Sequence, residues 1–226
     1  MKTMPKALLM ILSYIFSMFV MPSVAITFMI RIIGVREPAM LMVMGNFISY
    51  LFLAVCALVI LGGDLVADFK KLPAWHKIVG AVLGGWGLLF LANIVASNLL
   101  HALTAVEGAS KNQQAINTIM DVHPFIMAAT TVLLAPLVEE LVFRKTIMGG
   151  LKKLHPILSI GLSSFLFGLI HVVSGGDFIF IIPYMAMGIP LGWSYYRHKN
   201  IWIPIGIHVM QNLFSTLVII LPLFLR

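Results

Sequence analysis

Apolar runs long enough to cross a lipid bilayer recur along this 226-residue chain and constrain its fold more than any other feature. The hydrocarbon core of a bilayer is about 30 Å thick, so a helix of about 20 mostly apolar residues spans it. We expect seven such helices, at residues 7–30, 39–62, 78–100, 124–143, 157–173, 178–196 and 201–225. The sequence therefore predicts an all-α, polytopic transmembrane helical bundle of about seven spans. An eighth span or a re-entrant segment is the alternative.

The composition agrees with one integral membrane domain that uses the whole chain, residues 1–226. Hydrophobic residues make up 61% of the sequence and charged residues only 10%, whereas about a quarter of the residues in soluble domains are charged. A cleavable signal peptide does not account for this bias, because the apolar runs continue to the last residues. No internal repeat and no shift in composition marks a second domain.

The basic residues lie in short groups between the apolar runs. The net charge is +7, and the N-terminus and the segments 63–77, 144–156 and 197–200 hold eleven of the fifteen lysines and arginines. This spread argues against a nucleic-acid partner and favours contact with anionic lipid. By the positive-inside rule these segments face the cytoplasm. We therefore expect a multi-pass protein of a bacterial cytoplasmic membrane, with a cytoplasmic N-terminus.

The single cysteine, Cys56, lies inside the second apolar run. One cysteine allows no intramolecular disulfide and no cysteine-based metal site. A cysteine nucleophile is also disfavoured, which directs attention to the other polar side chains of the spans.

Two adjacent carboxylates stand out among the acidic residues. Six of the eight acidic residues fall between the spans or at their ends, whereas Glu139 and Glu140 belong to the fourth span. Of seven histidines, only His171 and His208 lie inside apolar runs. A charged side chain at the centre of a bilayer costs roughly 3 kcal/mol on insertion scales, so these residues need partners or a function.

Helical spacing divides the two glutamates into different roles. Glu140 and Arg144 are four residues apart, which puts them on one helix face where they can neutralise each other. Glu139 is rotated from Glu140 by about 100° and is free to face elsewhere. The spacing predicts Arg144 as an internal counter-ion of Glu140.

The two intramembrane histidines also have neighbours on their own helix faces. Phe167 precedes His171 by four residues, and Asn212 follows His208 by four. The first pair covers an imidazole with an aromatic ring. The second places a ring nitrogen and a side-chain amide on one face.

The depths of these groups agree only if the fourth helix continues beyond Arg144. Were it to end there, Glu139 would lie about 7 Å from the membrane edge and His171 about 20 Å, at 1.5 Å per residue. A helix that continues to the Gly149-Gly150 break puts Glu139 at about 20 Å as well. We then expect the polar groups to meet near the midplane, in a water-accessible cavity that opens to the cytoplasm.

This set of side chains fits the hydrolysis of a peptide bond. A carboxylate beside an imidazole can take a proton from water, which assigns Glu139 and His171 to water activation. A second imidazole and an amide can donate hydrogen bonds to the oxyanion, which assigns those roles to His208 and Asn212. On this interpretation no cofactor is required.

A metal-dependent mechanism is the alternative for the same residues. Glu139, His171 and His208 match the ligand set of a catalytic zinc ion that keeps one position open for water. The chain contains no His-Glu-x-x-His segment, and Asn212 would then need another role. The sequence leaves a divalent metal such as zinc open.

Two other interpretations use the same polar residues differently. A buried Glu-Arg pair and interior histidines can serve helix packing alone. Chains of carboxylates and histidines also form proton or ion pathways in transporters, but the repeated pair of broken helices that is typical of many transporters is missing. The occurrence of such residues on three spans favours a catalytic site.

The chain resembles the CPBP family of intramembrane proteases, which includes CAAX-processing endopeptidases and bacteriocin-immunity proteins. The motifs EExxxR, FxxxH and HxxxN occur in family order as Glu139-Glu140-Leu141-Val142-Phe143-Arg144, Phe167-Gly168-Leu169-Ile170-His171 and His208-Val209-Met210-Gln211-Asn212. The resemblance covers residues 124–215 as a catalytic core. It implies water activation by Glu139 and His171, an oxyanion site at His208 and Asn212, and support from Glu140 and Arg144.

The expected function is therefore that of an intramembrane endopeptidase. Its partners would be the lipid bilayer and a membrane-associated or hydrophobic peptide, or a membrane protein, as substrate. The residues indicate neither an oligomeric state nor recognition of a prenyl chain. A non-proteolytic membrane protein that confers immunity or regulates a partner is the alternative.

Overall fold

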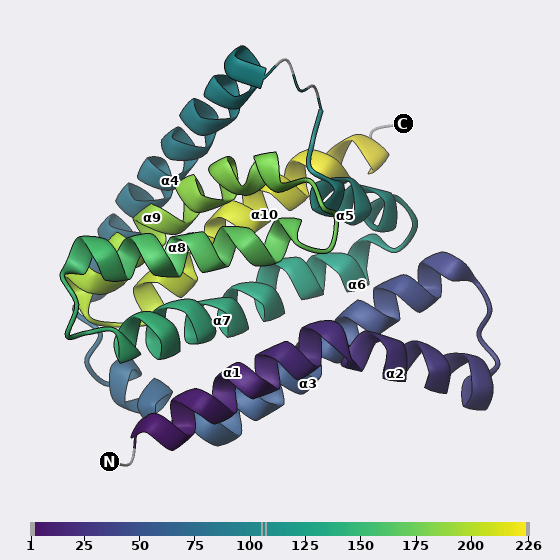
Figure 1. Cartoon of the computed structure of the whole chain (residues 1–226), viewed down its shortest axis with the longest axis horizontal. Helices are drawn as coiled ribbons and strands as arrows, with labels where there is room; N and C mark the ends of the chain where they lie inside the picture. The colour runs from purple at the N-terminus through teal and green to yellow at the C-terminus, as the bar shows by residue number, and fades with distance from the viewer. Residues whose placement is uncertain (1–2, 105, 107, 225–226) are drawn as a thin grey trace.

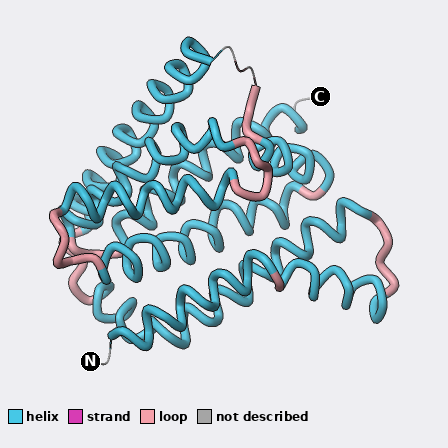
Figure 2. Tube along the Cα trace, viewed as in Figure 1, coloured by secondary structure: helices cyan, strands magenta, loops and turns pink. Residues whose placement is uncertain are grey.

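The computed structural model describes residues 3–104, 106 and 108–224, and these residues form helices without any strand (Figures 1 and 2). The all-α prediction is confirmed. In chain order the helices are α1 (Thr3–Phe19), α2 (Met21–Phe28), α3 (Pro38–Phe69), α4 (Trp75–Thr104), α5 (Lys111–Val122), α6 (Pro124–Ala128), α7 (Ala135–Glu140), α8 (Pro156–Val172), α9 (Ile181–His198) and α10 (Trp202–Phe224). The π-helical segments η1 (Met29–Ile33), η2 (Ala129–Leu134) and η3 (Leu141–Met148) and the 3-10 turn η4 (Phe178–Phe180) extend four of them.

Among the described residues, five helical stretches, or six if a bent pair is counted as one, are candidates to span a membrane by length and composition, so the predicted count of seven is not confirmed. Five helical stretches are long and apolar enough to cross a bilayer: Pro38–Phe69, Trp75–Thr104, Pro124–Met148, Phe178–His198 and Trp202–Pro222. The first two helices are bent by 47° at a short break and make a sixth span if they are counted together. Helix α8 has 17 residues and is shorter than a usual span. It is bounded by Pro156 and by the turn that contains Gly175 and Gly176.

The fourth predicted span continues past Arg144, as the depth comparison requires. Helices α6, η2, α7 and η3 form one rod from Pro124 to Met148. Within this rod Pro136 is the second residue after the π-helical segment η2. Proline has no amide hydrogen and displaces the carbonyl one turn earlier, which favours a widened turn at that point. The two glutamates end the short helix α7, between this irregular turn and the π-helical segment η3.

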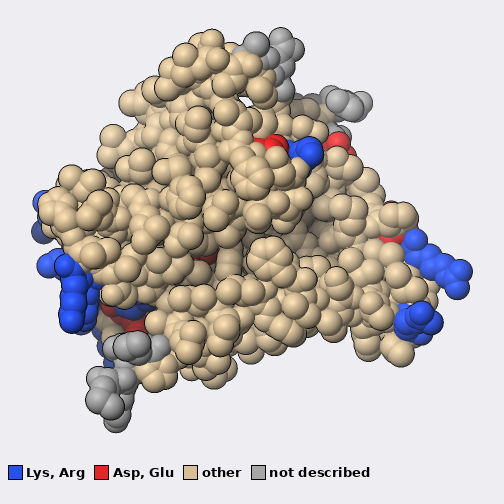
Figure 3. Space-filling view, in the orientation of Figure 1, with Lys and Arg blue, Asp and Glu red and all other residues tan. Residues whose placement is uncertain are grey.

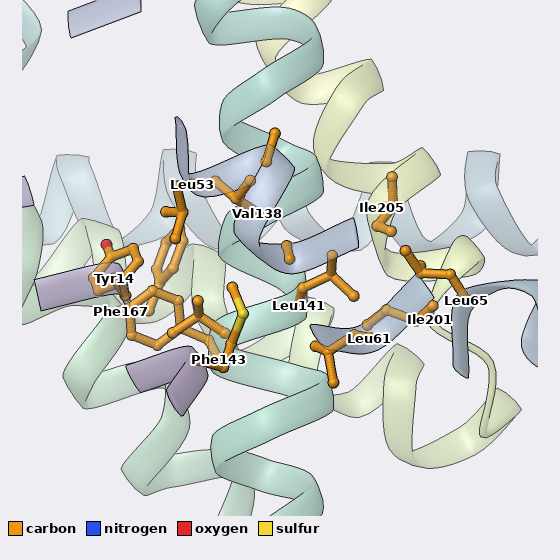
Figure 4. Packing of buried hydrophobic residues seen from close by; sticks show 14 residues of the cluster. Tyr14, Leu53, Leu61, Leu65, Val138, Leu141, Phe143, Phe167, Ile201 and Ile205 are labelled. Atoms are coloured by element: carbon orange, nitrogen blue, oxygen red, sulfur yellow. The ribbon is translucent and has the colours of Figure 1, made fainter. Parts of the chain in front are cut away.

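The main apolar core joins the N-terminal helices to this rod and to α8 and α10. Its members come from five parts of the chain (Figure 4). Phe143 is central, because its ring packs edge-to-face on Tyr14 at 5.6 Å and on Phe167 at 5.5 Å. Offset and edge-to-face ring pairs add to the energy of burying their area. The layer around Phe143 lies between the two glutamates and the end of the bundle that carries the N-terminus.

A hydrogen-bonded group holds the elements together at the end of the bundle that carries the N-terminus. The Lys145 ammonium lies 2.5 Å from the Asp68 carboxylate at the end of α3. The Asn200 side chain donates to the Asp68 carbonyl at 2.7 Å, and Trp202 donates to the Leu65 carbonyl at 3.1 Å. The ion pair with Asp68 neutralises Lys145, which explains how a lysine can lie within this helical rod.

Many charged side chains lie toward the two ends of the molecule, and only a few are visible in the broad band between them (Figure 3). The N-terminus lies at one end of the long axis (Figure 1). Many large apolar side chains outside the core are exposed. In water such a surface would be unfavourable, whereas in lipid it is the expected covering of a spanning bundle.

We predict that Asp68→Ala lowers the free energy of unfolding by about 1–3 kcal/mol, because it leaves a half-buried ammonium without its partner. Thermal or denaturant unfolding in detergent micelles measures the change. Asp64→Ala is the matched control on the same helix, since its contact with Lys6 is 3.2 Å long and about half exposed. An exposed ion pair contributes at most about 1 kcal/mol, so equal losses for the two variants would contradict the prediction.

Candidate active site

The two adjacent glutamates face different surroundings, as their spacing predicts. Glu140 is fully buried, and its carboxylate lies 3.1 Å from the guanidinium of Arg144. Glu139 is also buried by its neighbours, but its carboxylate lines a cavity. The internal counter-ion role of Arg144 is confirmed.

Arg144 is held from three sides. Its guanidinium donates to the carbonyl of Gly188 at 3.1 Å and lies 4.7 Å from the centre of the Phe167 ring. A side chain at position 188 would come within 2.9 Å of Ser164, so glycine permits the close approach of α9 and α8. A buried ion pair of this kind is retained only when further hydrogen bonds compensate for lost hydration.

His208 lies between the two carboxylates. Its Nδ1 is 2.9 Å from Glu140, and its Nε2 is 3.9 Å from Glu139. Since an ionised carboxylate only accepts hydrogen bonds, Nδ1 is assigned as the donor. Its Nε2 then faces the cavity, at a distance from Glu139 that a bridging water or substrate oxygen can fill.

His171 reaches the same cavity from α8. Its Nδ1–H donates to the Phe167 carbonyl at 2.7 Å, so Nε2 is the nitrogen that remains for chemistry. The imidazole packs on the ring of Phe167 at 4.7 Å and stacks on Tyr184 at 4.5 Å. The predicted aromatic cover on the helix face of His171 is confirmed.

Asn212 lines the cavity one turn beyond His208. Its Nδ2 donates to the carbonyl of Thr131 at 2.8 Å. This bond orients the amide and uses one of its two N–H groups. The other N–H is available to an acceptor in the cavity.

The structure adds Tyr50 to the predicted residues. Its hydroxyl donates to Glu139 at 2.8 Å. The residues are 89 positions apart, so no helical spacing reveals the contact. A polar aromatic residue within a span was the available signal.

Four of the six predicted site residues, Glu139, His171, His208 and Asn212, line one cavity of about 640 Å³. Phe167 lines it as well, whereas Glu140 and Arg144 do not. We had expected the cavity to open toward the basic end of the bundle, and this is wrong. Its lining extends instead toward the connection between α4 and α5, where Gly108, Ala109 and Ser110 line it.

As they lie, the predicted metal ligands do not form a ligand set. In the described part of the chain, no three His, Cys, Asp or Glu side chains are grouped so that they could hold a metal ion. Both Nδ1 atoms are engaged by protein groups, which leaves His171 Nε2, His208 Nε2 and Glu139 as possible donors. Metal binding would require these three to move closer together, and the metal-dependent alternative stays a prediction.

A comparison with protein families matches residues 121–214 to the type II CAAX prenyl endopeptidase Rce1-like family. All three sequence motifs fall inside this segment. The resemblance to CAAX-processing membrane proteases is therefore confirmed for this part of the chain.

Bacterial proteins of related sequence carry matching names. The chain is 29% identical over 178 residues to YdiL of Bacillus subtilis, which is named as a membrane peptidase, and 31% identical over 149 residues to the membrane-embedded CAAX protease MroQ of Staphylococcus aureus. These alignments cover 78% and 63% of this chain, and 70% and 58% of the relatives. A third relative, YvdC of Lactococcus lactis, is 26% identical over 61% of this chain and 51% of its own length. No solved structure matches.

We predict that Arg144→Met destabilises the protein by about 3–5 kcal/mol, because it leaves the Glu140 carboxylate buried without its cation. Unfolding in detergent micelles measures the loss. The double variant Glu140→Gln/Arg144→Met is the control, since it removes both charges. It should be more stable than Arg144→Met alone, and the opposite order would contradict a charge-based role for Arg144.

Proposed function

With residues 121–214 matched to the Rce1-like family, we propose that this chain is an intramembrane endopeptidase whose active site is the cavity floored by Glu139. The observation that carries the proposal is the meeting of three motifs from separate helices around that one cavity. Glu139 itself is 3% exposed, so few water molecules can touch its carboxylate at one time. These are the conditions under which one positioned water can be activated.

Glu139 is the proposed general base. Tyr50 binds its Oε1, and Oε2 is left to face His208 and the cavity. Glu139 takes a proton from water as the water oxygen bonds to the peptide carbonyl carbon. The same proton then passes to the amide nitrogen as the carbon–nitrogen bond breaks, which releases a carboxylic acid and an amine and restores the Glu139 carboxylate.

The histidines and Asn212 are proposed to orient the water and stabilise the oxyanion. His171 Nε2 can accept a hydrogen bond from the attacking water, because its Nδ1 is already used. His208 can donate to the oxyanion from Nε2 when both ring nitrogens carry protons, with Nδ1–H held by Glu140. The free N–H of Asn212 supplies a second donor. Glu140 and Arg144 act through His208 and are positioning residues.

Two alternatives remain to be tested beside this mechanism. If a divalent metal takes part, Glu139, His171 and His208 would hold it, and it would polarise the peptide carbonyl or its water. If the chain is a non-proteolytic immunity or regulatory protein, the same cavity would bind a partner without cleaving it. The substrate that we propose is a membrane-associated or hydrophobic peptide, or a membrane protein.

We predict that Glu139→Gln lowers the cleavage rate at least about 1,000-fold, because the amide cannot accept the proton from water. Purified protein in proteoliposomes is incubated with a panel of epitope-tagged single-span peptides, and products are resolved by gel electrophoresis and mass spectrometry. Asp121→Asn is the matched control, as it neutralises an exposed carboxylate on α5. Full cleavage by a folded Glu139→Gln variant would end the proposal.

The same assay separates the two hydrolytic mechanisms. On the metal-free mechanism, cleavage persists after treatment with EDTA and 1,10-phenanthroline, and metal analysis of active protein finds less than one ion per chain. Loss of activity on chelation that zinc restores would favour the metal-dependent alternative instead. A phenotype that survives Glu139→Gln while no peptide is cut would favour the non-proteolytic one.

We predict that Tyr50→Phe lowers kcat about tenfold with little change in KM, since one hydrogen bond to a charged group is worth about 1.5–3 kcal/mol. Tyr14→Phe is the matched control: Tyr14 also lines the cavity, but its buried hydroxyl has no hydrogen-bond partner in the described structure. Steady-state kinetics on the peptide found in the panel tests this. Equal effects of the two substitutions would show that Tyr50 contributes only packing.

A further inference from the structure

The cavity occupies only one half of the bundle along its length. Successive helices run in opposite directions, and the lining residues come from alternate ends of them. They lie late in α1, α4, α8 and α10 and early in α3 and α9. Every such end lies toward the connection between α4 and α5, remote from the described N-terminal residues (Figure 1).

The other half of the bundle is filled. Beneath Glu139 lie Glu140, Arg144 and Phe143, which are all at most 2% exposed. Beyond this layer, Lys145 and Asp68 join the rod to the end of α3. A peptide therefore has a path to Glu139 from the α4–α5 end and meets packed side chains from the basic end.

The charge distribution assigns these two ends to the two sides of a membrane. Loops rich in lysine and arginine lie at the packed end, in the segments 63–77, 149–156 and 197–200. Such loops remain in the cytoplasm. The cavity mouth, lined by Ser110, Asn112 and Gln113, then lies toward the non-cytoplasmic side.

The lining also limits the peptide that the cavity can accept. Among the lining residues that the structure describes, only Glu139 belongs to the four charged types Asp, Glu, Lys and Arg. The other polar groups are amides, hydroxyls and imidazoles. The amides and hydroxyls include Asn46, Asn93, Ser97, Asn112, Gln113, Thr130, Gln211 and Ser215. Such groups can pair with the amides of an extended backbone. An acidic side chain would lose hydration without gaining a counter-ion, and a basic side chain could pair only with Glu139, the proposed general base.

We propose that the substrate is a neutral peptide segment that reaches Glu139 from the non-cytoplasmic face. The inference rests on the proposed protease function for its chemistry, but the position of the mouth is independent of catalysis. On this proposal the substrate segment is exposed on the outer side of the membrane. It could lie next to the membrane anchor of an anchored peptide or within an exported peptide. Both parts can be tested separately.

The position of the mouth is tested by labelling with a membrane-impermeant maleimide. Starting from a Cys56→Ser chain, which has no other cysteine, single cysteines are introduced as Asn112→Cys at the mouth and Lys152→Cys at the basic end. In intact cells we expect labelling at position 112 and protection at position 152, and the reverse in inside-out vesicles. The opposite pattern would overturn the proposed orientation, whether or not the protein cleaves peptides.

The substrate is tested with two single-span peptides that carry the same neutral segment on opposite sides of the membrane. We expect cleavage only when the segment is outside, and at least a tenfold lower rate when one residue beside the scissile bond is changed to lysine. Preferred cleavage of the cytoplasmic segment, or equal rates with lysine, would overturn the inference. Cleavage of neither peptide would count against both the substrate inference and the protease function. The labelling result would still show on which side of the membrane the cavity opens.

Discussion

The buried contact among Glu140, Arg144 and His208 is the interaction on which the candidate site depends. It places a carboxylate and a guanidinium inside a bundle that is otherwise apolar, where each alone would be costly. The cost is offset by mutual neutralisation, by the Gly188 carbonyl and by the Phe167 ring. Because Glu140 also binds His208, the same contact ties α7 to α10 and sets the direction of the second imidazole.

This arrangement leaves Glu139 as the carboxylate that faces the cavity. Glu140 is occupied by Arg144 and His208, whereas Glu139 has a tyrosine hydroxyl on one oxygen and open space near the other. Two adjacent residues thus have separate tasks because a helix turns by about 100° per residue. The filled layer beneath them makes the cavity blind at one end. A cavity that is closed at one end limits the access of bulk water to the groups at that end.

The parts that the sequence predicted correctly are those governed by helical geometry. The division between Glu139 and Glu140, the aromatic cover of His171 and the extension of the helix past Arg144 all follow from 3.6 residues per turn and 1.5 Å per residue. The parts that it missed depend on contacts between distant segments. Neither Tyr50 as a partner of Glu139 nor His208 as the imidazole nearest to both glutamates could be derived from spacing along one helix.

The sequence alone determined an all-helical membrane bundle, the three motifs and the pairing within each helix, because apolar run length and helical periodicity are local properties. Only the tertiary structure decided which end of the bundle is hollow. Polar residues near the midplane are compatible with a cavity on either side, so the packing of Phe143 and the Asp68–Lys145 contact had to close one of them. The number of candidate spans also depends on the structure, because the 47° bend between the first two helices and the 17-residue length of α8 separate these helices from the single long spans.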